Sequence, residues 1–275
     1  MADWSKISSR GNVQDRRSMS PLFVGGGGLG VLGLVLYIVI NLLGGGDITD
    51  VVAQLPNLQV QSQAINTENL EKPDNYNVFA STVLGSANDM WKQVFAQNNK
   101  VYTAPTLVLF RTATQGSCGI STSEVGPHYC PLDKSIYLDE TFFDELQRRF
   151  GAQGGDVAEA YVIAHEVGHH AQNELGILNA VHEEGSSEAS IKAELQADCF
   201  AGLWANSIKD KGVFESGEIQ EALDAAAAVG DDRIQRATEG MVNPETWTHG
   251  SSEERMFWFN RGYETGRVAE CDTFN

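Results

Sequence analysis

The chain has 275 residues, and its 37 Asp and Glu against 19 Lys and Arg give a formal net charge of −18 at pH 7. This acidic balance disfavours nucleic acids and anionic membrane surfaces as partners, because both repel a negatively charged domain. The chain is long enough to bury the core of one sizeable domain, and no internal repeat indicates a solenoid or a propeller.

The N-terminal part of the sequence has the pattern of a membrane anchor. Residues 1–20 are polar and carry four Lys and Arg against two Asp, and residues 22–43, LFVGGGGLGVLGLVLYIVINLL, contain no charge. This run is long enough to cross a bilayer, so we predict a transmembrane helix over residues 21–44. The positive-inside rule then places the basic tail in the cytoplasm and the following domain in the periplasm or outside the cell. A cleaved signal peptide is the alternative, but its apolar core is shorter and no Ala-x-Ala site follows here.

The spacing of apolar residues predicts one mainly helical α+β domain over residues 74–275, after a polar linker over residues 45–73. Helices are predicted over residues 75–97, 141–150, 156–175, 191–209, 216–229 and 252–263, with a shorter helix after residue 231. Strands are predicted over residues 106–110 (TLVLF) and 135–138 (SIYL), and residues 182–190 have the composition of a polar loop. Asp156 and Ser251 are predicted N-caps, and Gly176 is the predicted end of the helix that Asp156 begins.

Four cysteines, all beyond the apolar run, predict two disulfide bonds, since an even number in an oxidising compartment is typical of a disulfide framework. Cys118 and Cys130 flank a glycine-containing loop, so their pairing is the most economical one and leaves Cys199 for Cys271. Four free thiols or a zinc ribbon are the alternatives, and the lack of any Cys-x-x-Cys pair argues against the ribbon.

The predicted helix over residues 156–175 carries the pattern His165-Glu166-x-x-His169, which is typical of zinc peptidases. Two His four residues apart lie on one helix face, about 6 Å apart along the axis, so both imidazoles reach one tetrahedral Zn²⁺. Glu166 follows the first His and can act on a water as a general base without binding the metal. The preceding residues are mostly apolar, as in a core helix. The alternative is an ordinary helix that happens to contain histidines.

A catalytic zinc site usually has three protein ligands, so the two His need a third partner. A third His at the H-E-x-x-H-x-x-G-x-x-H spacing is excluded because that position is Leu175. Glu194 and Asp198 lie four residues apart on one face of another predicted helix, among apolar neighbours. We therefore predict Glu194 as the third ligand and Asp198 as the acceptor of the free N–H of a ligating His. The Glu residues of the polar loop 182–190 are weaker alternatives.

His249 is a candidate for the catalytic machinery because it stands just before a capped helix in a chain with only 6 His. It could stabilise the oxyanion of a tetrahedral intermediate by a hydrogen bond, and a packing role at the helix end is the alternative. An extended peptide substrate is expected to pair with an edge strand near the cleft, for which the two predicted strands are the candidates.

These segments together resemble the bacterial family of neutral zinc metallopeptidases with a single N-terminal membrane span. The resemblance covers nearly the whole chain and rests on Asn12-Val-Gln-Asp-Arg-Arg17, Tyr129-Cys-Pro131, Tyr161-Val-Ile-Ala-His-Glu-Val-Gly-His-His170, Glu194-Leu-Gln-Ala-Asp-Cys-Phe-Ala-Gly202, Gly230-Asp-Asp-Arg233 and Thr248-His-Gly250. It implies a bacterial source and a zincin-like peptidase fold with a Glu as the third zinc ligand.

The sequence therefore predicts a membrane-anchored metallopeptidase that hydrolyses peptide bonds, with Zn²⁺ held by His165, His169 and Glu194 and with Glu166 as the general base. A peptide or a protein is the expected substrate. Two other classes stay open, namely a non-catalytic membrane-anchored module that zinc stabilises and a zinc amidase that acts on cell-wall peptides. Zinc content together with a peptidase assay separates the first of these from an enzyme, and a substrate panel separates the second.

Overall fold

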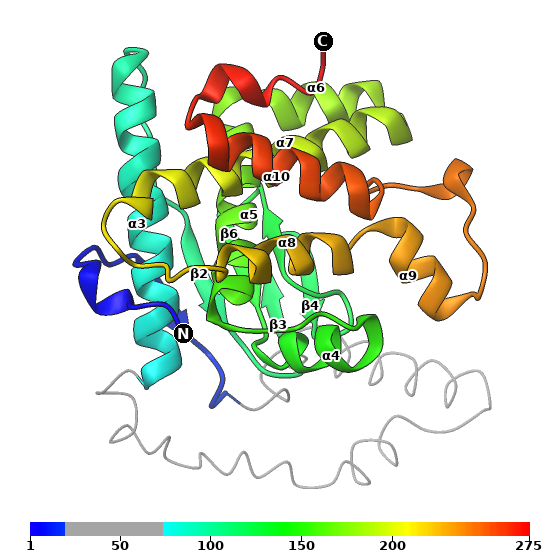
Figure 1. Ribbon diagram of the computed structural model, residues 1–275, viewed down its shortest axis with the longest axis horizontal. Coiled ribbons are helices and arrows are strands. Elements are labelled where there is room, and N and C mark those ends of the chain that lie inside the picture. Colours follow the sequence, from blue (N-terminus) through cyan, green and yellow to red (C-terminus); the bar gives the residue numbers. More distant parts are fainter. Residues whose placement is uncertain (20–73) are drawn as a thin grey trace, which may run out of the picture. The chain divides into compact units, whose positions relative to one another are not determined.

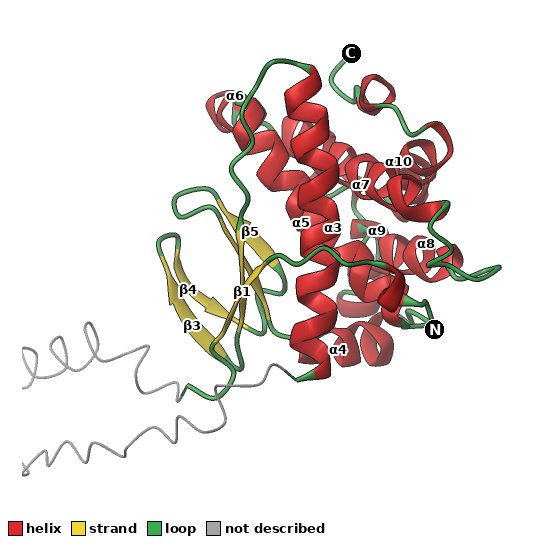
Figure 2. Cartoon of the chain, turned by 90° about the vertical axis from the view of Figure 1, so that its left-hand side faces the viewer, coloured by secondary structure: helices red, strands yellow, loops and turns green. Residues whose placement is uncertain are grey.

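Helices make up most of the fold, and small β-sheets lie along one side of them (Figures 1 and 2). The computed structural model describes residues 1–19 and 74–275, of which residues 1–18 and 75–275 form one compact unit. The helices are α3 (Asn75–Gln97), α4 (Thr141–Phe150), α5 (Asp156–Leu175), α6 (Ile177–Glu184), α7 (Ser187–Lys209), α8 (Ile219–Ala228), α9 (Asp231–Thr238) and α10 (Ser252–Thr265). The strands are β1 (Asn12–Asp15), β2 (Thr106–Leu109), β3 (Ala113–Gly116), β4 (Gly119–Thr122), β5 (His128–Cys130) and β6 (Ser135–Leu138). The predicted mainly helical α+β class is confirmed.

The N-terminal segment belongs to the same folded unit as the rest of the described chain. Strand β1 pairs with β2 in parallel, with Asn12 opposite Thr106 and Asp15 opposite Leu109. Before β1, the indole of Trp4 donates a hydrogen bond of 2.8 Å to Asp156 at the start of α5 and stacks on Trp204. Two strands of one ladder exchange backbone hydrogen bonds along their length, so both must lie in the same compartment.

The predicted membrane topology needs correction for this reason. We predicted a tail in the cytoplasm and a domain on the other side of a single span, and the β1–β2 pairing shows that this arrangement is wrong. In residues 1–19 and 74–275, no helix has the length and the apolar character to cross a bilayer. The predicted span over residues 21–44 and the predicted linker over residues 45–73 lie outside the described residues.

A four-stranded sheet in the order β1-β2-β6-β5 packs against α3 and α5. Strands β1, β2 and β6 are parallel, β5 runs antiparallel to β6, and β3 and β4 form a separate hairpin. The two central strands are covered on both faces, which explains why they appear in the sequence as short continuous apolar runs. Both of them have a neighbour on each side, so the edges of this sheet are β1 and β5.

Helix α5 lies at the centre of the helical layer and contacts α3, α7 and α8. Gly168 allows the close approach of α7, because a Cβ atom at this position would lie 3.1 Å from the Cα of Ala197. On another face of α7, Gly202 meets α10, and a Cβ on it would lie 2.0 Å from the carbonyl oxygen of Phe259. These glycines therefore allow α7 to pack closely between α5 and α10.

The ends of several helices differ from the prediction; α8, for example, spans Ile219–Ala228 and not residues 216–229. The N-cap of α5 is Gly155, with φ 110°, and not Asp156. Glu221 of α8 accepts the N–H of Val157 at 3.2 Å, so one of the first free N–H groups of α5 has a partner on another helix. Residues 182–190 are largely helical, since α6 runs to Glu184 and Ser186 caps α7. The predicted ends at Gly176 and at Ser251, which forms a capping box with Glu254, are confirmed.

Both predicted disulfide bonds are confirmed. Cys118 joins Cys130, which connects the turn before β4 to the end of β5, and Cys199 of α7 joins Cys271 near the C-terminus. The second bond lies in the core beside α10, where both of its sulfur atoms belong to fully buried residues. No free cysteine is found in the described part of the chain.

Candidate metal centre

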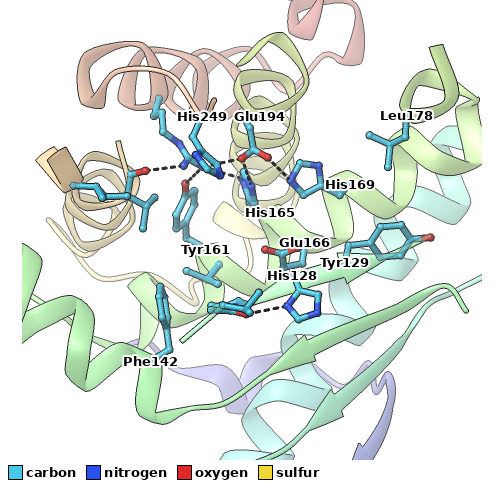
Figure 3. Close-up of a pocket in the computed structure, with 17 residues that line it drawn as sticks. His128, Tyr129, Phe142, Tyr161, His165, Glu166, His169, Leu178, Glu194 and His249 are labelled. Atoms are coloured by element: carbon cyan, nitrogen blue, oxygen red, sulfur yellow. Dashed lines mark hydrogen bonds and ion pairs between the residues drawn. The ribbon is translucent and has the colours of Figure 1, made fainter. Parts of the chain in front are cut away.

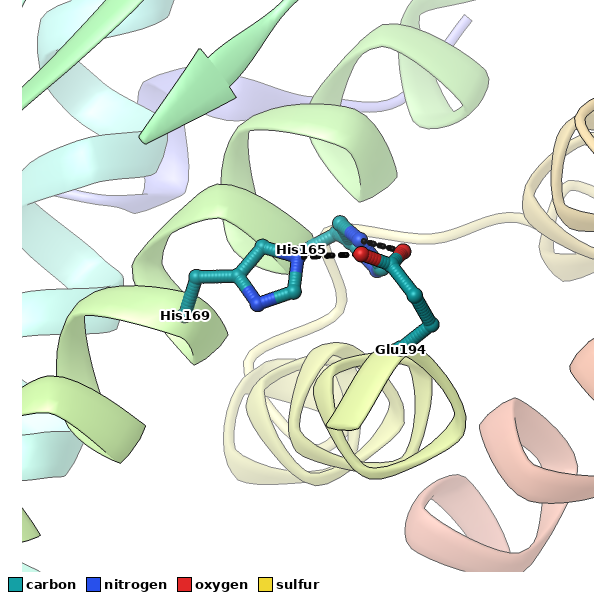
Figure 4. A group of neighbouring side chains, drawn as sticks. All are labelled: His165, His169 and Glu194. Carbon is teal, nitrogen blue, oxygen red and sulfur yellow. Dashed lines mark ion pairs between the residues drawn. The ribbon is translucent and has the colours of Figure 1, made fainter. Parts of the chain in front are cut away.

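Three side chains from two helices converge at one point beside α5. His165 and His169 project from successive turns of α5, and Glu194 projects from α7 towards them (Figure 4). The Nε2 atom of His165 lies 3.3 Å from Glu194 Oε2, and Nε2 of His169 lies 3.3 Å from Glu194 Oε1. One donor atom from each residue falls within 4.8 Å of the others, which is the spacing that a single metal ion needs.

The other ring nitrogens of both His are held by fully buried acceptors. Nδ1 of His165 lies 2.9 Å from Asp198, and Nδ1 of His169 lies 2.9 Å from the amide oxygen of Gln172. Both acceptors require a proton on Nδ1, so each Nε2 presents its lone pair at the point of convergence. Gln172 is itself fixed by a hydrogen bond of 2.7 Å to the Ala193 carbonyl of α7. This second layer orients the rings as metal ligands require.

Asp198 is the hub of a buried charged network. Its carboxylate accepts hydrogen bonds from Tyr161 (2.5 Å) and from Arg255 (2.8 and 3.0 Å), in addition to its contact with His165. Burial raises the pKa of this carboxyl group, but Arg255 and His165 outweigh that effect and lower it. Asp198 is therefore an anion with no exposed surface, which is stable only because it is paired on every side.

The titration of the ligand candidates reflects an excess of negative charge. Burial alone would lower the pKa of His165, but the carboxylates of Asp198 and Glu194 outweigh it and raise this pKa to about 10. Burial raises the pKa of Glu194, yet His169 and His165 hold it well below its usual value. Two imidazoles with raised pKa values and a carboxylate that stays ionised offer lone pairs and negative charge at one point, which suits a divalent cation.

The three residues open onto a pocket of 490 Å³ that the catalytic candidates share. Glu166 faces into it next to His165, and its Oε2 is buried without a hydrogen-bond partner among the described residues. Burying a carboxylate oxygen without a hydrogen bond is unfavourable, so Oε2 of Glu166 is available to accept a hydrogen bond from a molecule in the pocket. Phe142 lies towards one end of the pocket, and Tyr129 and Leu178 lie towards the other, with Glu166 between them (Figure 3).

His249 also lines the pocket, with 49% of its side-chain surface exposed. It reaches the site from the loop before α10, and Asp231 at the start of α9 lies 3.1 Å from its Nδ1. The hydrogen bond that His249 donates to Asp231 is the main reason that the pKa of His249 is raised, against the opposing effect of burial. His249 thus lines the same pocket as His165 and Glu194, and its predicted role as a donor to the oxyanion stays a prediction.

Some site residues were not predicted from the sequence. Tyr161 and Arg255 complete the Asp198 network, and Asp231 holds His249. The sequence signal for Arg255 was its place directly before an apolar run on a predicted helix. In the structure it is only 3% exposed, a state that a charged residue adopts only when paired. In contrast, Glu183, Glu184 and Glu188, the alternatives for the third ligand, are exposed and lie outside the group.

The predicted position of the substrate strand needs correction. We expected an extended peptide to pair with residues 106–110 or 135–138, but β2 and β6 already have a partner on both sides. The free edge beside the pocket belongs to β5, of which His128 and Tyr129 line the cavity. A three-residue strand that contains a histidine and a cysteine has too weak a pattern to be predicted from the sequence.

Comparison with known proteins supports the interpretation of this centre. Residues 2–274 match the model of the family described as "Putative neutral zinc metallopeptidase". The chain belongs to this family. It is similar to the uncharacterized protein YpfJ of Escherichia coli K12, with 41% identity over 285 residues that cover 98% of each chain. It is also similar to the uncharacterized protein Rv2575 of Mycobacterium tuberculosis H37Rv, with 46% identity over 202 residues that cover 69% of this chain and 68% of the relative. No solved structure gives a match.

Proposed function

We propose that the chain is a zinc metallopeptidase that hydrolyses peptide bonds, with His165, His169 and Glu194 as metal ligands and Glu166 as general base. The observation that carries this proposal is the meeting of the three donor atoms with the unpaired Oε2 of Glu166 in one 490 Å³ pocket. The family to which the chain belongs supports a hydrolase of this class.

The donor set fits zinc better than the other common divalent ions. Two imidazole nitrogens and one carboxylate favour zinc, whereas magnesium and calcium prefer oxygen ligands. A structural zinc site is closed by a fourth protein ligand, but the described residues offer only three, and these border a pocket. This argues for a reactive centre over a structural staple. Zinc in such a site supplies a Lewis acid that lowers the pKa of a water molecule and polarises a carbonyl oxygen.

The protein groups then carry the proton and hold the substrate. Glu166 takes a proton from the attacking water as the new C–O bond forms, and it delivers that proton to the leaving amine as the C–N bond breaks. His249 can donate a hydrogen bond to the substrate carbonyl oxygen, where negative charge develops. The backbone of an extended peptide can pair with the free edge of β5 and present its carbonyl group to Glu166.

The test compares isosteric variants with a matched control. Glu166→Gln should retain about one zinc per chain and lose hydrolysis of an unstructured protein substrate by a factor of about 10² or more, since a positioned general base contributes about 10²–10⁴-fold. Glu194→Gln should lose both zinc and activity. The control is Glu188→Gln, which removes an exposed carboxylate that pairs with Lys192 on the same helix and should change neither.

Three results would contradict the proposal. Full activity of Glu166→Gln would exclude the general base, and full zinc retention by Glu194→Gln would exclude the third ligand. A zinc-loaded wild type that cleaves peptidoglycan peptides but no protein would favour the cell-wall amidase.

A further inference from the structure

Two segments that are separate in the sequence, residues 230–233 and residues 248–250, meet in one hydrogen-bonded unit at the edge of the pocket. Asp231 Oδ2 accepts the backbone N–H groups of Thr248 (2.7 Å), His249 (2.6 Å) and Gly250 (3.1 Å). The N–H of Asp231 donates in return to the carbonyl oxygen of Gly250 at 2.9 Å. Asp231 is only 8% exposed, and one oxygen of its carboxylate thus holds the backbone of the loop that carries His249.

The second oxygen of Asp231 acts on the imidazole ring of His249. Oδ1 lies 3.1 Å from Nδ1, and the hydroxyl oxygen of Thr248 lies 2.9 Å from the same nitrogen. A carboxylate only accepts hydrogen bonds, so the Nδ1 atom must carry the proton. The atom that remains for a ligand is Nε2, on the far side of the ring. His249 lies beside Glu194 at the pocket (Figure 3).

We propose, on the basis of the proposed function, that Asp231 is a positioning residue of the active site, which holds His249 with Nε2 directed at the carbonyl oxygen of the bound peptide. Asp231 does not touch the substrate. It acts through the tautomer and the orientation of His249, in the same way that a carboxylate orients a metal-ligating imidazole.

The charges around His249 agree with a donor role. Asp231 on α9 and Glu194 on α7 raise the pKa of the ring, whereas burial and Arg255 on α10 lower it, and the net direction is upward. A histidine whose Nδ1–H is bound to a carboxylate donates from Nε2 only as an imidazolium. The raised pKa extends the pH range in which that donor exists.

Asp232 provides a matched control for this proposal. It carries the same charge on the next residue of the same helix, and its Oδ1 accepts the N–H and the hydroxyl of Ser252, each at 2.7 Å. It thereby holds the start of α10 and has no contact with His249. Asp231→Asn and Asp232→Asn therefore remove one negative charge each from neighbouring positions, but only the first one changes the partner of the imidazole.

The first measurement is the ¹⁵N NMR signature of the His249 ring in the full-length protein. In the wild type at alkaline pH, the proton of the neutral ring should reside on Nδ1. Asp231→Asn should abolish this preference, because an amide group can donate as well as accept, and Asp232→Asn should preserve it. The amide signals of residues 248–250 report whether the loop is intact, since the side-chain oxygen of Asn can still accept their N–H groups. An unchanged ring signature in Asp231→Asn overturns the proposal.

The second measurement is a kinetic cycle with His249→Ala, which leaves the three backbone bonds of Asp231 in place. Asp231→Asn should lower kcat/KM about 10–100-fold in the wild-type background and should have no further effect in the His249→Ala background. His249→Ala alone should cost at least as much. An equal loss in both backgrounds, or a smaller loss for His249→Ala than for Asp231→Asn, contradicts the proposal. A wild type that hydrolyses no peptide refutes the proposed function, whereas the NMR signature still decides whether Asp231 orients His249.

Discussion

Replacing Arg255 by methionine should destabilise the fold and weaken zinc binding at the same time. The guanidinium group is 3% exposed, spans both oxygens of Asp198 at 2.8 and 3.0 Å, and donates a further bond of 3.1 Å to the Val229 carbonyl. Methionine fills a similar volume but leaves the carboxylate of Asp198, which has no exposed surface, without its cation. Removing one partner of a buried ion pair costs about 3–5 kcal/mol. Because Tyr161 and His165 still bind Asp198, we expect the lower value, about 3 kcal/mol.

Two assays measure this effect. Urea denaturation gives the free energy of unfolding, and competition with a chelator gives the zinc affinity. We expect the affinity to fall about 10–100-fold, because the partner that orients His165 loses its own support. The control is Arg261→Met on the same helix, where the arginine is 40% exposed and pairs with Glu270. An exposed pair contributes less than about 1 kcal/mol, and zinc affinity should not change.

A double variant distinguishes the lost pairing from a general packing defect. Asp198→Asn removes the charge that Arg255 neutralises, so Asp198→Asn with Arg255→Met should be more stable than the sum of the single changes by about 1 kcal/mol or more. Strict additivity, or equal unfolding free energies for Arg255→Met and Arg261→Met, would refute the reasoning from the buried ion pair.

Three further predictions follow from the packing and the charges. Burial and neighbouring carboxylates raise the pKa of Glu159 to about 7 in the folded protein. The protonated side chain therefore stabilises the fold below the pKa of the unfolded chain, and this contribution is lost as the pH rises towards 7. Glu159→Gln should raise the melting temperature at about pH 8 but not at about pH 4.5, and an equal shift at both pH values would contradict this. Gly168→Val should lower the free energy of unfolding by about 1–3 kcal/mol and reduce the zinc content, because the valine side chain collides with Ala197 and separates α5 from α7. An unchanged zinc content together with an unchanged urea denaturation curve would show that the two helices move apart freely. Replacing both Cys118 and Cys130 by serine removes a cross-link over 12 residues, which should lower the free energy of unfolding by about 3 kcal/mol through the added entropy of the unfolded chain. It should also raise KM, because the loop between the two cysteines lines the pocket. An unchanged KM would exclude a role of this loop in substrate binding.

The predicted helices agree with the structure where their pattern is local. The helices at residues 75–97 and 141–150 have the predicted bounds, and so does α5, because apolar periodicity and turn-forming glycines act over a few residues. The short strands show the opposite case. Strand β1 (NVQD) and strand β5 (HYC) carry almost no pattern of their own, and each exists because a neighbouring strand supplies its hydrogen bonds. The error in the predicted topology has this origin, since β1 lies in the tail of residues 1–20, which we had placed in the cytoplasm, away from the rest of the domain.

The candidate site divides in the same way. The spacing of His165 and His169, and of Glu194 and Asp198, is determined by the sequence, because residues four apart on any helix share a face. How α5 and α7 pack, and therefore whether Glu194 meets the two His, depends on a close approach at Gly168 that no local pattern describes.

The sequence by itself thus determined the types of the ligating groups, their helical spacing and the pairing of the cysteines. Only the tertiary structure decided that Arg255 neutralises Asp198, that Asp231 holds His249, and that β5 is the edge strand that lines the pocket. These partners lie 57 and 18 residues apart in the chain, or depend on the order of strands in a sheet. Contacts between residues so far apart in the chain depend on how the helices and strands pack. This packing is set by burial, charge and shape over the whole fold.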